Sequence, residues 1–340
     1  MRVFRLLLFL VLIIVIGSLL YWLSFAPKED ASSRIYKTLK EQEKRADLFF
    51  KQVSFEEVSS GIRYWQLRAE TAMVNKSTGI ATLQKAEGTF FKKGKAVLRF
   101  RSPAAMWDMK KKEIYLDKPL GYDVLLERKI SSLIKTIGKE PSSIFNFPKI
   151  FRAGEGYWFQ ANNLSWKLAD EQLICTGGIV LHKGEVTGNS ETLKGDVALE
   201  KVSLEGNPRI TIRSGKIAPV TVEADAFEVL NSQDTILAQG NPRITWEDSK
   251  VTSEKAKYIQ ADSKLKMDGS VKVDYKDIQA SGDSASYFTE SQQIMLEGKA
   301  QAQQGQNQLS GDKVMVSLKD QKIYLLGKSR VTITEEKLKK

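Results

Sequence analysis

Residues 281–298 read SGDSASYFTESQQIMLEG, and residues 310–327 read SGDKVMVSLKDQKIYLLG. Both stretches begin with Ser-Gly-Asp and end with Leu-x-Gly, although almost everything between has changed. The closing glycine recurs every 29 residues, at positions 240, 269, 298 and 327. A tandem repeat of this length indicates structural units that stack on one another and share a single core.

Within one unit the side chains alternate with the period of a β-strand. Apolar residues follow Gly269 at every second position, and the same holds after Gly240. A second alternating run begins thirteen residues before each glycine, as at Ala285 and Tyr287. One unit therefore predicts two strands and two turns.

Degenerate copies of the unit extend toward the N-terminus. GNPRITI at 206–212 nearly repeats GNPRITW at 240–246, and Leu164, Trp166 and Gly177 keep the same interval. The sequence therefore predicts an all-β body made of one long repetitive sheet. A β-solenoid and an elongated open antiparallel β-jellyroll both satisfy the pattern, and the short connections rich in Asn, Asp and Gly favour the jellyroll.

The N-terminus carries a candidate membrane anchor. Residues 6–26 contain no charged side chain, and about 20 apolar residues are enough for a helix to cross a bilayer. Arg2 and Arg5 precede this run, which places the N-terminus in the cytoplasm by the positive-inside tendency. We expect a single-pass inner-membrane protein with its body in the periplasm; the alternative is a signal peptide cleaved after Ala26.

Composition divides the chain further. A charge-dense stretch after the anchor predicts an exposed linker or short surface helix. In 123–151, apolar residues recur at helical spacing and stop before Pro141, which predicts an amphipathic helix that caps the first β part or touches a membrane or partner. The expected divisions are an anchor at 1–27, a polar linker at 28–48, a first β part at 49–122, the helix or linker at 123–150, a second β part at 151–334 and a charged tail at 335–340.

The chain offers little material for catalysis. Its one cysteine, Cys175, excludes an internal disulfide, and its one histidine, His182, stands in GGIVLHKGE without a recognisable catalytic or metal-binding spacing. We read His182 as a residue near a strand end. The sequence predicts no catalytic residue, no metal site and no cofactor.

Positive charge is concentrated in the first β part. Residues 28–150 hold 25 Lys and Arg against 15 Asp and Glu, whereas residues 151–340 hold 25 against 26. FFKKGKAVLRFR at 90–101 and DMKKKE at 108–113 either meet anionic head groups or phosphorylated sugars, or form a solvated strand face. No nucleic-acid recognition helix or strand motif is visible, so nucleic acid is not an expected partner.

Residues 61–118 resemble the LptC family of lipopolysaccharide-transport proteins. The resemblance lies in the Trp-x-Leu-x-Ala-Glu-x-Ala phrase that begins at Trp65, and in an Ala-x-Trp-Asp phrase that precedes an Ile-x-Leu strand, behind a single N-terminal anchor. The units from roughly 200 to 333 resemble the related OstA/LptA-type repeats. The chain is longer than a short LptC by this second region.

The resemblance implies a bridge of β-jellyrolls that passes lipopolysaccharide from an inner-membrane ABC transporter of the LptBFG type toward the outer membrane. It further implies an LptA-like partner added at a strand edge, for which the last strand, YLLGKSRVTITEE, offers an edge; the alternative there is an ordinary solvated last strand. The lipid would contact apolar side chains on the inner strand faces. The expected residues are Trp65, Leu67, Phe90, Leu98, Trp107, Ile114, Leu116, Ile210, Ile212, Ile244, Trp246, Val271, Val273, Tyr287 and Leu296.

Three classes of function stay open from the sequence. The first is the lipid-conducting bridge, and the second is an anchored structural or adhesive repeat protein with a closed core and no lipid. The third is an enzyme acting on polysaccharide, which would need paired carboxylates in a cleft. The acidic residues fall in turns without such a signature, so the bridge ranks first and the enzyme last.

Overall fold

The computed structural model describes residues 33, 35–38, 40–41, 46–126, 156–213 and 218–333. The predicted anchor at 6–26 and most of the predicted helix at 123–151 lie outside these ranges. Of that helix, the structure describes only a short 3-10 turn, η1 (Val124–Leu126). Within the described ranges, no helix is long and apolar enough to cross a membrane.

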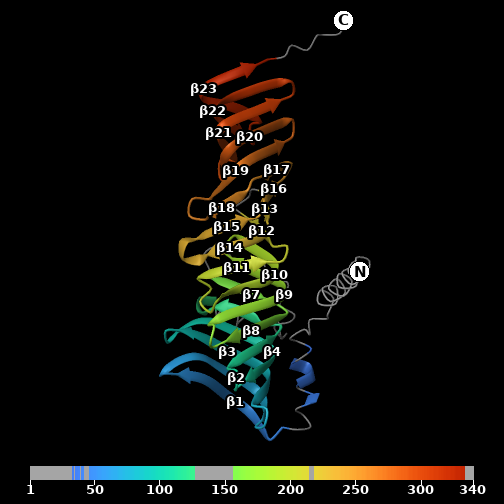
Figure 1. Cartoon of the computed structure of the whole chain (residues 1–340), viewed down its shortest axis with the longest axis vertical. Helices are drawn as coiled ribbons and strands as arrows, with labels where there is room; N and C mark the ends of the chain where they lie inside the picture. Colours follow the sequence, from blue (N-terminus) through green and yellow to red (C-terminus); the bar gives the residue numbers. More distant parts are fainter. Residues whose placement is uncertain are drawn as a thin grey trace, which may run out of the picture.

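The body is all-β, as predicted. In the part of the chain that the structure describes, twenty-three strands form one sheet, and they stack along a single long axis from β1 at one end to β23 at the other (Figure 1). Every pairing is antiparallel, with neighbours in sequence or one hairpin away. The antiparallel alternative of the two predicted architectures is therefore the observed one.

Nine long strands each contribute to two facing halves of the sheet, here called wall A and wall B. They are β1 (Leu48–Ser59), β2 (Ile62–Asn75), β3 (Ile80–Lys92), β4 (Lys95–Asp108), β9 (Gln172–Lys183), β10 (Val186–Asp196), β19 (Lys264–Tyr275), β20 (Ile278–Phe288) and β21 (Gln293–Gln304). The last two strands, β22 (Asn307–Ser317) and β23 (Lys322–Thr332), also contribute to both walls.

Each short strand belongs to one wall only. For example, one half of the long strand β4 pairs with the short strand β5, and the other half pairs with the short strand β6. Wall A contains β5 (Glu113–Asp117), β8 (Asn163–Lys167), β11 (Lys201–Glu205), β14 (Ala226–Leu230), β15 (Thr235–Gln239) and β18 (Lys255–Ile259). Wall B contains β6 (Leu120–Asp123), β7 (Tyr157–Gln160), β12 (Arg209–Ile212), β13 (Val220–Glu223), β16 (Arg243–Trp246) and β17 (Ser249–Thr252).

The two walls meet along a corner, where the repeated glycines lie. The register shifts in the middle of the long strands, between Asp268 and Val271 and between Glu297 and Ala300. At the second of these shifts, Gly298 has φ 74° and the following Lys299 has φ 50°. Two successive left-handed residues turn the strand from one wall into the other, and glycine accepts that conformation without the penalty of a Cβ.

Contacts at this corner explain why Ser-Gly-Asp and Leu-x-Gly recur in the repeat. A Cβ built on Gly298 would lie 2.6 Å from Oδ2 of Asp283, and one on Gly327 would lie 2.5 Å from Oδ2 of Asp312. Asp312 also accepts a hydrogen bond from the backbone N–H of Lys328 at 2.9 Å. The Asp of each Ser-Gly-Asp therefore packs against the glycine that closes the same unit, which lies fifteen residues later and one strand away.

Replacing Gly298 with alanine should lower the free energy of unfolding by more than the about 1–2 kcal/mol that a left-handed backbone costs a residue with a side chain. The excess comes from the displacement of Asp283. Gly305→Ala is the control, since Gly305 has φ 60° and a Cβ there would meet no atom within 4 Å. Urea unfolding of both variants measures the difference; equal losses would contradict the packing role of Asp283.

A helical segment near the N-terminus packs on the outside of wall A. Residues 33, 35–38 and 40–41 are helical, and Ile35 is fully buried against Met73, Ala104 and Met106. The Tyr36 hydroxyl donates to Oδ2 of Asp117 at 3.0 Å. This part of the predicted linker is therefore a surface helix that is attached to the β body.

Candidate functional site

The inner faces of the two walls form one continuous apolar cluster. The fifteen residues predicted to line the interior all lie in this cluster, fourteen of them at most 4% exposed. Trp107 is the exception, half-buried at the edge of the cluster. The side chains that alternate in the sequence therefore share one buried inner face along the body.

The interior is packed rather than hollow at most levels. Opposite the corner, the hairpin tips of the two walls face each other along a line that we call the mouth. Aromatic side chains bridge the walls near it: the rings of Trp65 and Trp107 lie 5.0 Å apart, and those of Trp246 and Tyr287 stack at 4.6 Å. Such pairs stabilise contact beyond their area of burial, by about 0.5–1.5 kcal/mol each.

Polar side chains join the same tips across the mouth. Nζ of Lys92, at the end of β3, lies 2.6 Å from Asp196 and 2.8 Å from Glu200. These hydrogen bonds raise the pKa of Lys92 despite partial burial. The side chains of Lys92 and Asp196 are each 32% exposed and that of Glu200 is 60% exposed. Because water reaches both pairs, each contributes only about 0–1 kcal/mol. The polar contacts close the mouth without making it costly to open.

Two further contacts cross the mouth. Nζ of Lys183, at the end of β9, donates to Oδ1 of Asp234 at 2.8 Å, and the Tyr275 hydroxyl donates to the carbonyl oxygen of Leu318 at 2.9 Å. No backbone ladder connects the tips that these side chains join, within the strands that the structure describes. Each of these contacts across the mouth therefore depends on at least one side chain.

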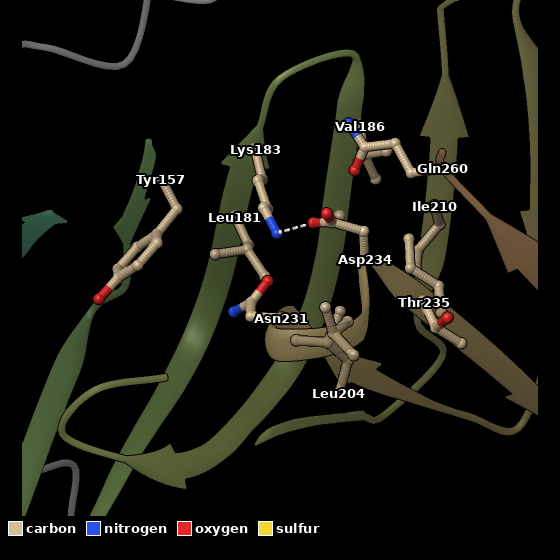
Figure 2. Close-up of a pocket in the computed structure, with 13 residues that line it drawn as sticks. Tyr157, Leu181, Lys183, Val186, Leu204, Ile210, Asn231, Asp234, Thr235 and Gln260 are labelled. Carbon is tan, nitrogen blue, oxygen red and sulfur yellow. Dashed lines mark hydrogen bonds and ion pairs between the residues drawn. The ribbon is translucent and has the colours of Figure 1, made fainter. Parts of the chain in front are cut away.

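A cavity of about 30 Å³ lies beneath the Lys183–Asp234 pair (Figure 2). Its lining is apolar from both walls, with Leu181 and Ile210 from wall B and Leu204 and Val229 from wall A. This volume holds about one water molecule, whereas sites for small organic ligands run to about 300–1,000 Å³. A lipid chain therefore needs the walls to separate.

Burial changes the chemistry of two interior side chains. Tyr287 is fully buried, and desolvation, together with the nearby carboxylate of Glu247, raises its pKa to about 12. Burial also raises the pKa of the Cys175 thiol well above its ordinary value. Both groups therefore stay neutral at physiological pH, as an apolar interior requires.

Cys175 reports on whether the walls are closed. Because its thiol is fully buried and protonated, a maleimide should react with the folded protein at least about a hundredfold more slowly than with the urea-unfolded chain, since the thiolate is the reactive form. Timed labelling followed by mass spectrometry measures both rates. Equal rates in the folded and unfolded states would show that the interior opens freely in the absence of lipid.

His182 is a buried residue near a strand end, as predicted. It precedes the last residue of β9, its Nδ1 lies 3.1 Å from the Thr187 hydroxyl, and its ring lies 5.6 Å from that of Trp158. Among the described residues, no group of three or more His, Cys, Asp or Glu side chains could hold a metal ion.

Some side chains of the two basic clusters are paired with acidic neighbours. Besides Lys92, Arg101 pairs with Glu87 at 3.0 Å and Lys112 with Glu57 at 3.0 Å. Lys92 and Lys112 thus connect strands far apart in the sequence. In the cluster at 90–101, Lys92 therefore joins the two walls, whereas Arg101 pairs within wall B.

Each end of the body presents a strand with one free edge. Among the described strands, β1 pairs only with β2, and β23 pairs only with β22. Large apolar side chains are exposed there, among them Phe49 and Val58 on β1 and Leu326 and Val331 on β23. Exposed, unpaired edges with apolar side chains are the kind of surface that accepts a strand from another chain.

Comparison with known proteins identifies one part of the body. Residues 221–322 match the family model described as "LptA/(LptD N-terminal domain) LPS transport protein". The expected similarity of the second β part to LptA-type proteins is therefore matched over the stretch that runs from β13 into β23. Residues 61–118, which carry the resemblance to LptC, lie outside the match.

The solved structures that the chain resembles include LptH, "the LptA homologous periplasmic component of the conserved lipopolysaccharide transport device from Pseudomonas aeruginosa". The alignment covers 35% of this chain and 96% of LptH, with 18% identity and a TM-score of 0.33. No curated protein matches the chain.

Proposed function

We propose that the chain is a membrane-anchored periplasmic component of the lipopolysaccharide export bridge. In this proposal the acyl chains of lipopolysaccharide travel between walls A and B while the sugars project from the mouth. The observation that carries it is the match of residues 221–322 to the LPS-transport family, within a body whose apolar interior runs unbroken from one free edge to the other.

The anchor and the partners belong to the same proposal. Residues 6–26 would hold the chain in the inner membrane, and β1 would face an ABC transporter complex of the LptBFG type. At the opposite end, β23 would accept an edge strand of an LptA-like protein. The chain itself would carry out no catalysis, and the energy for movement would come from the transporter.

Side-chain closure of the mouth suits such a passage. Interactions across the mouth such as Lys92–Asp196 are solvent-accessible and individually weak, so a lipid can replace them locally. Apolar burial of an acyl chain, at about 25 cal/mol per Å², would replace the contacts that the walls lose. The absence of a strong polar anchor among the fifteen inner residues would keep the lipid free to move on.

A second candidate is an anchored structural or adhesive repeat protein with a closed core. The packed interior favours it, because Trp246, Tyr287 and their neighbours already fill the space between the walls. The two candidates differ in whether lipid enters the interior. A conduit takes up the acyl chains between its walls, whereas the structural or adhesive protein keeps its interior closed.

Binding of purified lipopolysaccharide tests the proposal. The full chain should bind intact lipopolysaccharide, and the delipidated polysaccharide released by mild acid should neither bind nor compete. Binding should also raise the labelling rate of Cys175, because the walls separate. Equal binding of the two ligands, with Cys175 still protected, would reject the conduit and favour the adhesive protein.

A further inference from the structure

The stretch of the mouth around the cavity differs from its neighbours. Toward the N-terminal end the walls are joined by Phe90 and Trp166, whose rings lie 5.6 Å apart. Toward the C-terminal end they are joined by the stacked pair Trp246 and Tyr287. Between these two aromatic contacts, the cavity lies under the Lys183–Asp234 ion pair.

The walls leave a gap at this level. Leu181, Val186 and Val229 keep 8% of their surface exposed, and Ile236 keeps 9%, whereas Tyr287 and Phe90 keep none. Gly188 also occupies an inner-face position, directly between Leu181 and Ile210 in the register. A glycine there supplies no side chain to the interior, so the opposing Leu204 reaches into the space instead.

The contact above the cavity is exposed and exchangeable. The side chains of Lys183 and Asp234 are 28% and 55% exposed. Asp234 follows the 3-10 turn η3 (Asn231–Gln233) in a left-handed conformation, and its carbonyl oxygen accepts a hydrogen bond from the N–H of Gln260 at 3.0 Å. The Asp234 carboxylate thus lies at a hairpin tip, where anions in the solvent compete with it for the ion pair with Lys183.

We propose that this place is a port at which one acyl chain of an anionic amphiphile enters the space between the walls. The acyl chain passes between Leu181, Leu204 and Val229. A phosphate of the head group replaces Asp234 as the partner of Lys183. Lys183 places a positive charge above an apolar gap that suits an anionic head group with an acyl chain, and Figure 2 shows the Lys183–Asp234 pair together with Leu181 and Leu204. The inference depends on the proposed function and adds the site and chemistry of lipid admission.

The test uses dodecyl phosphate with a diazirine near the end of its chain, and the full-length protein. After illumination, mass spectrometry locates the modified peptides. Asp234→Asn removes the competing charge while keeping a residue that accepts the left-handed conformation. Val229→Phe fills the cavity, and Asp170→Asn is the matched control, because Asp170 pairs with Lys167 at a wall A tip away from the cavity.

We expect adducts on β11 and β14, with a yield that rises about two- to fivefold in Asp234→Asn, the range that one exposed ion pair allows. Asp170→Asn should match the wild type, and Val229→Phe should fall to background with an unfolding midpoint that confirms folding. Dodecyl maltoside with the same photoreactive tail should gain nothing from Asp234→Asn, because its head group carries no charge.

Equal phosphate-probe yields in the wild type and Asp234→Asn, or adducts spread evenly along the interior, would overturn the port. Photo-crosslinking of lipopolysaccharide to a photoreactive residue placed at Val273 separates the two proposals. If they persist while the port variants have no effect, the bridge function stands and lipid enters elsewhere. If neither ligand labels the interior, both proposals fail.

Discussion

Replacing Trp246 with alanine is expected to lower the free energy of unfolding by about 3–5 kcal/mol. Trp246 lies on wall B with 4% of its surface exposed, and its ring stacks on Tyr287 of wall A at 4.6 Å and 21°. The truncation removes a large buried surface, and it also leaves Tyr287 without its partner across the interior. The substitution therefore loses packing contacts in both walls.

Urea unfolding followed by circular dichroism measures this loss. Tyr324→Ala is the control, because Tyr324 is 39% exposed on β23 and a surface substitution of this kind changes stability by within about 0.5 kcal/mol. A Trp246→Ala protein as stable as the control would mean that the two walls do not pack together in solution.

The second large effect is expected at the free edge of β23. Replacing Leu326 and Val331 together with lysine should weaken association with an LptA-type partner at least tenfold, or about 1.4 kcal/mol. These side chains are 41% and 51% exposed, so their replacement should leave β22 and the interior intact. Lysines on an edge strand oppose the addition of another strand, because their charges would have to be desolvated.

The matched control for this prediction is Val58→Lys. Val58 is 48% exposed on β1, at the opposite end of the body, and its replacement should leave the association unchanged. Biolayer interferometry with an immobilised LptA-type protein measures both affinities. A loss that is the same for both variants would show that the partner does not discriminate between the two ends.

The sequence predicted the inner face because one physical rule governs it. Strand side chains alternate, so Val271 and Val273 had to share a face, and the repeat extended that face along the chain. The glycine spacing likewise marked, in every unit, the bend between the two walls. What the spacing left out was the reason for Asp283 and Asp312, although an acidic residue fifteen positions before each of the four repeated glycines was visible as a signal.

The mouth could not be predicted in the same way. Lys92 and Asp196 are separated by 104 residues, and no local pattern states which hairpin tips will face each other across two walls. The cavity depends on Gly188, Leu204 and their opposing side chains, and its size is a matter of tertiary packing. Ile35 is a similar case, since one apolar residue in a charged stretch gives no measure of its burial against Met73 and Met106.

The most direct test of the conduit is photo-crosslinking in living cells, with a photoreactive residue in turn at Trp107 and at Val273. These positions lie in the first and second β parts, on the same apolar inner face. We predict lipopolysaccharide adducts at both positions that disappear when cellular ATP is depleted. Crosslinks only to neighbouring strands of the same chain, with no lipopolysaccharide at either position, would contradict the account and leave a closed repeat protein.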